Sequence, residues 1–159
     1  MTKSLEKWQF GDFQTPDRLA QEVVKVLKLN HKISPKSIVE PSCGTGSFVR
    51  AVLKEFTHSR ILGLKKKKKY VEAANLSISE YLNSENATIH QSDFFNTDWK
   101  SLISNLSGDI LIVGNPPWVT SSELSILNSQ NLPVKSNFQN RRGIEAITGS
   151  GNFDISEWM

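Results

Sequence analysis

Apolar residues along the chain follow two kinds of spacing, helical in some segments and strand-like in others. Helical spacing predicts helices over residues 16–30, 47–56, 66–82 and 99–106. Between them, short apolar runs predict strands over residues 37–40, 60–64, 88–90 and 109–113. Strands that alternate with helices are typical of βαβ units, so the pattern predicts an α/β fold with a mostly parallel sheet and flanking helices.

Two of these elements lead to specific expectations. The first helix is expected to have Thr15 as its N-cap and Pro16 as its first residue. The apolar positions that recur along it are Leu19, Val23, Val26 and Leu27. The strand at residues 109–113 is apolar without interruption, which is typical of a fully buried strand in a parallel sheet.

The sequence pattern changes after residue 118. Ser and Asn make up nine of the twenty residues from 121 to 140, without periodicity, so this segment is expected to be a long loop of the kind that often carries function. Residues 152–159 are similar to the start of a capped helix, with Asp154 as the N-cap and Glu157 three residues later.

Composition limits the class of protein. The 159 residues are 38% hydrophobic and 22% charged, which is typical of one globular domain. No apolar run approaches the roughly 18 residues of a membrane span, and residues 1–11 lack the apolar segment of a secretory signal. The single cysteine, Cys43, cannot form an internal disulfide, which agrees with a reducing, cytoplasmic compartment.

The net charge of +3 comes from one segment, the five consecutive lysines at residues 65–69. Without them, 14 basic residues face 16 acidic ones. A basic surface spread over the whole protein would indicate nucleic-acid binding, but a single lysine run is weak support for it.

The first candidate site lies between the strand at 37–40 and the helix at 47–56. Glu40 ends the strand, and the sequence continues Pro41-Ser42-Cys43-Gly44-Thr45-Gly46. Glycines let a backbone turn sharply and approach a ligand, and the N–H groups that open the next helix suit an anion. Val49 replaces the third glycine of the dinucleotide-binding fingerprint. The glycines alone fit a ligand-binding turn and a plain tight turn about equally well.

The second candidate site, Asn115-Pro116-Pro117-Trp118, follows the strand at 109–113. Its two prolines remove two backbone donors and hold the carbonyl groups of Asn115 and Pro116 rigidly. The Asn115 side chain adds an acceptor, and Trp118 offers a flat apolar face. The plainer alternative is a stiff loop with a packed tryptophan. Its position after an apolar strand favours a site for a planar molecule that carries an NH₂ group.

The two motifs, in this order, resemble those of the S-adenosylmethionine-dependent, amino-methylating DNA methyltransferases, in particular the adenine-specific enzymes of bacterial restriction–modification systems. Three further segments are similar to the family's: Phe13-Gln14-Thr15-Pro16, Ser92-Asp93-Phe94 and Asn152-Phe153-Asp154-Ile155. The resemblance covers residues 10–159 and implies a Rossmann-like class I methyltransferase fold.

The resemblance also implies a role for each matching residue. The implied cofactor-binding residues are Phe13, Thr15, Glu40, Pro41, Ser42, Cys43, Gly44, Gly46, Asp93 and Phe94, and the implied catalytic residues are Asn115, Pro116, Pro117 and Trp118. Glu40, the glycine turn and the Phe13–Thr15 pocket would hold the methionine end of S-adenosylmethionine. Asp93 and Phe94 would hold its adenine, while Asn115, Pro116 and Trp118 would hold a target base flipped out of DNA.

Neither a metal nor a general base is expected. His31, His58 and His90 are far apart in the sequence, without the spacing of metal ligands. Cytosine ring-carbon methyltransferases use a Pro-Cys nucleophile at the position where this chain has Asn115-Pro116. Cys43 lies in the cofactor turn instead and is expected to be a small packing residue.

Lys65 departs from the family pattern. The family places a carboxylate for the cofactor's ribose hydroxyls at the end of the second strand, and an ammonium group cannot accept those hydrogen bonds. Three interpretations stay open: a degraded site, a solvated helix start with Glu72 or another acid as substitute, or a lysine run that is not natural. A binder of a phosphorylated dinucleotide is a remote fourth.

The length is the second departure. Only 41 residues follow Trp118, fewer than a complete methyltransferase sheet requires. We therefore expect a single partial domain: a cofactor-covering segment and helix (1–35), a βαβ core (36–118) and a Ser/Asn-rich loop with the start of a further helix (119–159). An unfinished sheet predicts exposed apolar surface and a partner, which would be the rest of the protein, a specificity subunit or a second copy.

The expected activity is methyl transfer from S-adenosylmethionine to the exocyclic amine of adenine in DNA. Methylation of a protein glutamine amide or an RNA base is the alternative, because the same acceptors fit any planar amide or amine. A binding module without activity is the second alternative, favoured by Lys65 and the short length.

Overall fold

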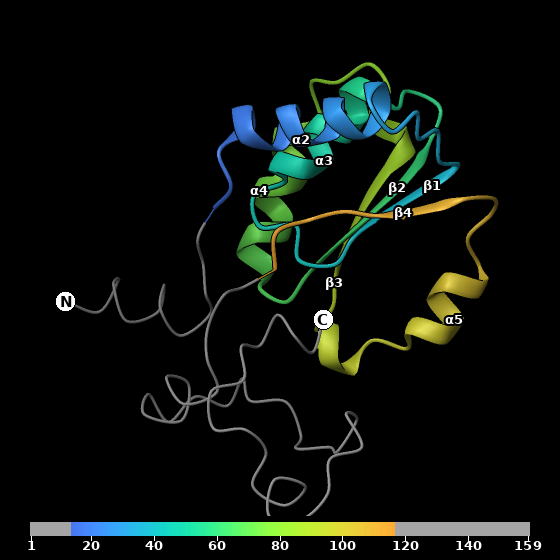
Figure 1. Ribbon diagram of the computed structural model, residues 1–159. Helices are drawn as coiled ribbons and strands as arrows, with labels where there is room; N and C mark the ends of the chain where they lie inside the picture. The colour runs from blue at the N-terminus through green and yellow to red at the C-terminus, as the bar shows by residue number, and fades with distance from the viewer. Residues whose placement is uncertain (1–13, 117–159) are drawn as a thin grey trace, which may run out of the picture. The chain divides into compact units, whose positions relative to one another are not determined.

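The computed structural model describes residues 14–116, and Figure 1 shows how their helices and strands are arranged. In chain order the elements are α2 (Asp17–Leu29), β1 (Ser37–Glu40), α3 (Ser47–Glu55), β2 (Arg60–Lys65), α4 (Lys68–Ile78), η1 (Ser84–Asn86), β3 (Ala87–Gln91), η2 (Phe94–Asn96), α5 (Trp99–Ser104) and β4 (Ile110–Ile112). Each helix and strand predicted within this range is present, and the largest difference is that α4 ends four residues earlier than expected. The predicted loop at 121–140 and the predicted helix start at Asp154 lie outside the described residues. No helix within residues 14–116 is both long and apolar enough to cross a membrane.

The sheet confirms the predicted fold class. Its strand order is β3-β2-β1-β4, and all three neighbouring pairs are parallel. Helices α2, α3 and α4 lie together on one side of this sheet (Figure 1). Because the strands are parallel, the segments that follow their carboxyl ends meet at one edge, where open α/β sheets bind ligands. Both candidate sites therefore lie at that edge.

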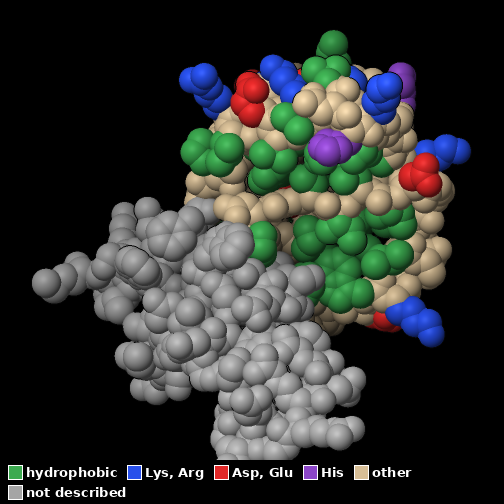
Figure 2. Space-filling view, viewed as in Figure 1, with side chains coloured by type: hydrophobic (Ala, Val, Ile, Leu, Met, Phe, Trp, Pro, Cys, Tyr) green, Lys and Arg blue, Asp and Glu red, His purple; other side chains and the backbone are tan. Residues whose placement is uncertain are grey.

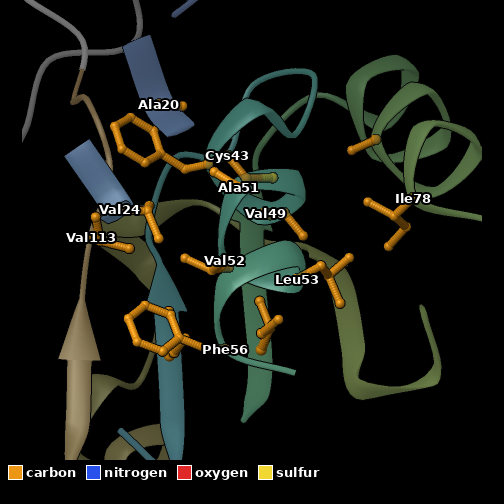
Figure 3. Close-up of a cluster of buried hydrophobic side chains, with 14 of the residues drawn as sticks. Ala20, Val24, Cys43, Val49, Ala51, Val52, Leu53, Phe56, Ile78 and Val113 are labelled. Carbon is orange, nitrogen blue, oxygen red and sulfur yellow. The ribbon is translucent and has the colours of Figure 1, made fainter. Parts of the chain in front are cut away.

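The core is built around α3, which packs between α2 and the sheet (Figure 3). Six of its nine residues are buried: Ser47, Phe48, Val49, Ala51, Val52 and Leu53. On one side they join Ala20 and Val24 of α2, and on the other Ile38 and Ile61 of the sheet. This two-sided burial removes apolar surface from water along the whole helix, which fixes where its first turn lies.

Helix α2 differs from the prediction at its start and in most of its buried face, although Leu27 packs against the core as expected. Its N-cap is Pro16, one residue after the expected Thr15. Leu19, Val23 and Val26 are 54%, 37% and 45% exposed, while Ala20 and Val24 are fully buried. The small side chain of Ala20 lets α2 approach α3 closely, and this approach decides which of two neighbouring apolar faces is buried.

Strand β4 also differs from the prediction, because it is not buried on both faces. Within residues 14–116 it is the edge strand, paired with β1 alone. Leu111 and Val113 pack against the core, whereas Ile112 points to the other face and is 60% exposed. Figure 2 shows a group of hydrophobic side chains, in green, on the lower part of the described surface. The apolar run therefore reflects one face that is packed in the core and one that is still exposed.

The neighbouring residues Ile112 and Val113 test this assignment of faces. We expect Ile112→Thr to change the free energy of unfolding by no more than about 0.5 kcal/mol, as is usual at exposed sites. Val113→Thr keeps the side-chain shape but buries a hydroxyl among apolar groups, so it should cost about 1–3 kcal/mol. Urea unfolding of the two variants measures the difference. Equal losses would contradict the assignment.

Candidate functional site

The glycine turn joins β1 to α3 and has the backbone geometry that its sequence predicts. Gly44 and Gly46 have φ values of +53° and +89°, in the left-handed region that L side chains rarely adopt. The Gly46 N–H donates to the Cys43 carbonyl over 2.7 Å, which closes the turn. A Cβ atom on Gly44 would also collide with Gln14 Oε1, which accepts from Thr45, so the Gln14 side chain would have to move. Both positions therefore favour glycine for its backbone conformation.

Glu40 ends β1 in a buried position at the foot of this turn. Glu40 is 3% exposed, and its Oε2 atom is the one buried side-chain nitrogen or oxygen among the described residues that has no hydrogen-bond partner. Burial raises the pKa of the Glu40 carboxyl to about 8, although a backbone contact with Val49 and the charges of Lys65 and Arg50 act to lower it. An unpartnered buried acceptor is costly, so the site is suited to a donor from a ligand.

The donor that fits Glu40 best is a cation. A protonated amine would supply the missing hydrogen bond and a charge that stabilises the ionised carboxylate. Gly114, which follows β4, has no side chain toward Glu40, and a Cβ there would lie 3.3 Å from Glu40 Cγ. The residues present therefore fit the amino-acid end of S-adenosylmethionine, whose ammonium group is such a donor.

The segment before α2 contacts both candidate sites. Gln14 Oε1 accepts from the Thr45 N–H over 2.9 Å and from the Thr45 hydroxyl over 3.2 Å. Asn115 Nδ2 donates to Thr15 Oγ1 over 3.2 Å. Thr15 was expected to line the cofactor pocket, but the contacts of Gln14 were not expected. The signal that could have indicated the Gln14 contacts is a polar side chain directly before the Thr15-Pro16 start of the helix.

Arg50 is the structural residue that the sequence did not reveal. Its guanidinium donates to the Thr45 carbonyl and to Ser77 Oγ, each over 2.7 Å, and it also pairs with Asp17. These contacts connect α2, α3 and α4 to the glycine turn. A charged residue on a helix is ordinarily a solvated one, so nothing in its local sequence indicated this role.

Asn115 and Pro116 follow β4, as predicted. The Asn115 carbonyl accepts from the Ser42 hydroxyl over 3.4 Å, so Asn115 and the glycine turn are in contact. Asn115 is half-buried, as are Pro41 and Ser42. The other predicted residues of these motifs, Phe13, Pro117 and Trp118, lie outside the described residues.

Asp93 and Phe94 lie after β3 at the same edge of the sheet. The Asp93 carboxylate accepts from the Phe95 N–H over 3.3 Å and forms an ion pair with Lys66 over 2.9 Å. The half-buried Phe94 ring packs against Trp99, with 4.7 Å between ring centroids. Asp93 thus caps the short η2 helix and pairs with the lysine run, while its role toward a cofactor stays a prediction.

Lys65 is the last residue of β2, next to the end of β1, where the family pattern has an acid. Its Nζ atom lies 5.0 Å from the centroid of the Tyr70 ring, in a cation–π arrangement. At the position where an acid was expected to bind the ribose, the structure therefore has an ammonium group, which cannot accept hydrogen bonds from the ribose hydroxyls.

Cys43 is buried in the turn and packs against β2. Burial raises the pKa of its thiol to about 12, so it is not a thiolate at neutral pH. A Cβ on Gly63 would lie 3.4 Å from Cys43 Sγ, so the cysteine fills the space that this glycine leaves. This geometry supports the predicted packing role.

Comparison with known proteins identifies related sequences. A family model described as N-6 DNA Methylase matches residues 2–154. The type II methyltransferase M.NspV of Nostoc sp. (strain ATCC 29411 / PCC 7524) is 46% identical over 158 residues, which cover 96% of this chain and 32% of that protein. The type II methyltransferase M.CvrRI of Paramecium bursaria Chlorella virus XZ-6E is 30% identical over 115 residues, which cover 72% of this chain and 26% of that protein.

Comparison of structures agrees on the fold. The methyltransferase subunit of a type I restriction-modification system from Streptococcus thermophilus has a TM-score of 0.52 at 17% identity, covering 75% of this chain and 26% of that one. The chain spans about a third or less of the length of the curated relatives it matches. With a family model matched over nearly all its residues and a relative at 46% identity, the chain belongs to the N-6 DNA methylase family.

Proposed function

We propose that this chain forms the cofactor-binding part of an enzyme that transfers a methyl group from S-adenosylmethionine to the N6 amine of adenine in DNA. The observation that carries the proposal is Glu40 Oε2, a buried acceptor without a partner at the carboxyl end of β1. It lies beside the strand that leads into Asn115 and Pro116, so one ligand at the sheet edge reaches both motifs.

The cofactor would be held from both ends. Glu40 accepts from its ammonium group, and the backbone of residues 41–46 surrounds its methionine part, with Phe13 and Thr15 lining the pocket. Asp93 accepts from its adenine amine, and Phe94 packs on its adenine ring. S-adenosylmethionine supplies a methyl group activated by the sulfonium, so the work of the protein is to position and orient.

The target adenine would be held by Asn115, Pro116, Pro117 and Trp118. The Asn115 side chain and the Pro116 carbonyl accept from its NH₂ group, Pro117 stiffens the turn, and Trp118 stacks on the ring. With S-adenosylmethionine bound, these residues would hold the amine nitrogen toward the methyl group that the cofactor supplies, and the amine proton that the methyl group replaces would leave to solvent. Flipping the base out of the duplex costs roughly a few kcal/mol, which stacking and these hydrogen bonds offset.

DNA recognition is expected to require more protein than the described residues. The relatives are about three times as long as the chain, and β4 exposes Ile112 at the edge of the described sheet. A remainder of the same protein, a specificity subunit or a second copy would cover this surface. The comparisons favour DNA over a glutamine amide or RNA base as the substrate, because the family model is named for DNA methylation. They favour an enzyme over a binding module, because the family model and both curated relatives are named for methyl transfer.

Methyl transfer to unmethylated DNA by the full-length protein tests the proposal. With radiolabelled S-adenosylmethionine, we expect label in N6-methyladenine after the DNA is digested to nucleosides. Asn115→Ala removes an acceptor for the target amine and should lower kcat about a hundredfold, while cofactor binding changes little. Label in protein or RNA but not in DNA would overturn the proposed substrate.

Glu40 should make stability depend on pH. Its pKa is about 8 in the folded chain and near 4.5 when exposed, so between these values the folded state holds a proton that the unfolded state has released. The free energy of unfolding should therefore fall as the pH rises from about 4.5 to about 8. Glu40→Gln should remove this slope and be more stable than the unaltered chain at pH 8, and exposed Glu72→Gln is the matched control. Urea unfolding between pH 5 and 9 measures the slope, and an unchanged slope in Glu40→Gln would contradict the burial argument.

Lys65 should limit cofactor affinity. Isothermal titration calorimetry with S-adenosylmethionine is expected to show weak or no binding to the unaltered chain. Lys65→Glu restores an acceptor for the ribose hydroxyls and should tighten binding by about tenfold, in line with two hydrogen bonds. Lys69→Glu changes the charge equally at an exposed position and should not. Tight binding by the unaltered chain would refute the degraded-site interpretation.

A further inference from the structure

Thr15 and Asn115 are a hundred residues apart in the sequence, yet they are joined by a hydrogen bond. The Asn115 side-chain amide donates through Nδ2 to Thr15 Oγ1 over 3.2 Å. Both residues are half-buried, which protects the bond from competition with water. We propose that Thr15 is a positioning residue for Asn115, setting the orientation of the carboxamide that receives the target amine. This inference rests on the proposed function.

The orientation of a carboxamide decides what it can bind. One end of the group donates and the other accepts, and a rotation of 180° exchanges them. While the Thr15 hydroxyl accepts from Nδ2, Oδ1 lies at the opposite end of the carboxamide. A target amine needs acceptors, so the rotamer that offers Oδ1 to it is productive. The reversed rotamer would place the Asn115 NH₂ group against the NH₂ group of the target. The Asn115 carbonyl is held as well, by the Ser42 hydroxyl over 3.4 Å.

Thr15 can position another residue because its own neighbours are fixed. Gln14 accepts two hydrogen bonds from Thr45 in the glycine turn. Asp17, two residues after Thr15, pairs with Arg50, and Arg50 Nη1 donates to the Thr45 carbonyl over 2.7 Å. The start of α2 is therefore attached to the glycine turn on both sides of Thr15. Through Thr15 this attachment extends to Asn115, so the cofactor turn and the target-base turn are held in one frame.

The role differs from that of lining the cofactor pocket, and the two roles have different consequences. A pocket residue acts on cofactor affinity, whereas a residue that orients Asn115 acts on the Asn115 amide and on kcat. Thr15→Val keeps the shape of the side chain and removes the hydroxyl. Thr15→Ser keeps the hydroxyl, and Thr88→Val makes the same change at an exposed position of β3.

The direct test is NMR of the side-chain amides in the cofactor-free chain labelled with ¹⁵N. The Asn115 pair of signals is assigned by its absence in Asn115→Asp. We expect Thr15→Val to shift these signals and to speed their exchange with water about tenfold, the equilibrium effect of one lost hydrogen bond. Thr15→Ser and Thr88→Val should leave them close to those of the unaltered chain.

The kinetic test uses the same variants of the full-length protein in DNA methyl transfer. We expect Thr15→Val to lower kcat about tenfold with the dissociation constant of S-adenosylmethionine within about twofold, and Thr15→Ser to restore the rate. Unmoved Asn115 signals in Thr15→Val would overturn the inference, as would weaker cofactor binding at an unchanged kcat. If the full-length protein transfers no methyl group to DNA, the proposed function fails, while the NMR result still decides whether Thr15 orients Asn115.

Discussion

The burial of α3 between α2 and the sheet is the constraint on which the rest of the site depends. Its apolar residues face both layers, so the helix can neither rotate nor slide without exposing them to water. The glycine turn must therefore cover a fixed distance from the end of β1 to the first turn of α3. Gly44 and Gly46 have positive φ values in this short connection, and Glu40 is buried beneath it.

Glu40 shows how a costly feature of the core fits a ligand site. Its buried oxygen has no partner among the described residues, and keeping the carboxyl protonated is the less costly state at neutral pH. A cationic ligand reverses this preference, because it supplies both a donor and a charge. In the proposed complex, ligand binding would recover the energy lost by burying the acceptor, which would link affinity to the stability of the fold.

Polar side chains around the glycine turn join segments that are far apart in the sequence. Arg50 connects three helices to the Thr45 carbonyl, and Gln14 binds the same residue from the other side. Gln14 lies in the Phe13–Pro16 segment, which resembles the family's, whereas Arg50 lies in a helix without a motif. Most of their partners are distant in sequence, so a local pattern of residue types does not specify which atoms they contact. This is why the motifs could be predicted and the contacts that align them could not.

Periodicity and motif order by themselves determined the α/β fold, the sequence of strands and helices, and the two segments that meet at the sheet edge. Regular spacing specifies an element because a helix and a strand each present their side chains with a fixed period. The tertiary structure decided what spacing leaves open. It selected Ala20 and Val24 rather than Leu19 and Val23 as the buried face of α2, and it left Ile112 of the apolar β4 exposed. Either face of α2 is apolar enough to pack, and the close approach of α2 to α3 at Ala20 determines which face is buried. Ile112 is exposed because β4 has no second neighbouring strand within residues 14–116.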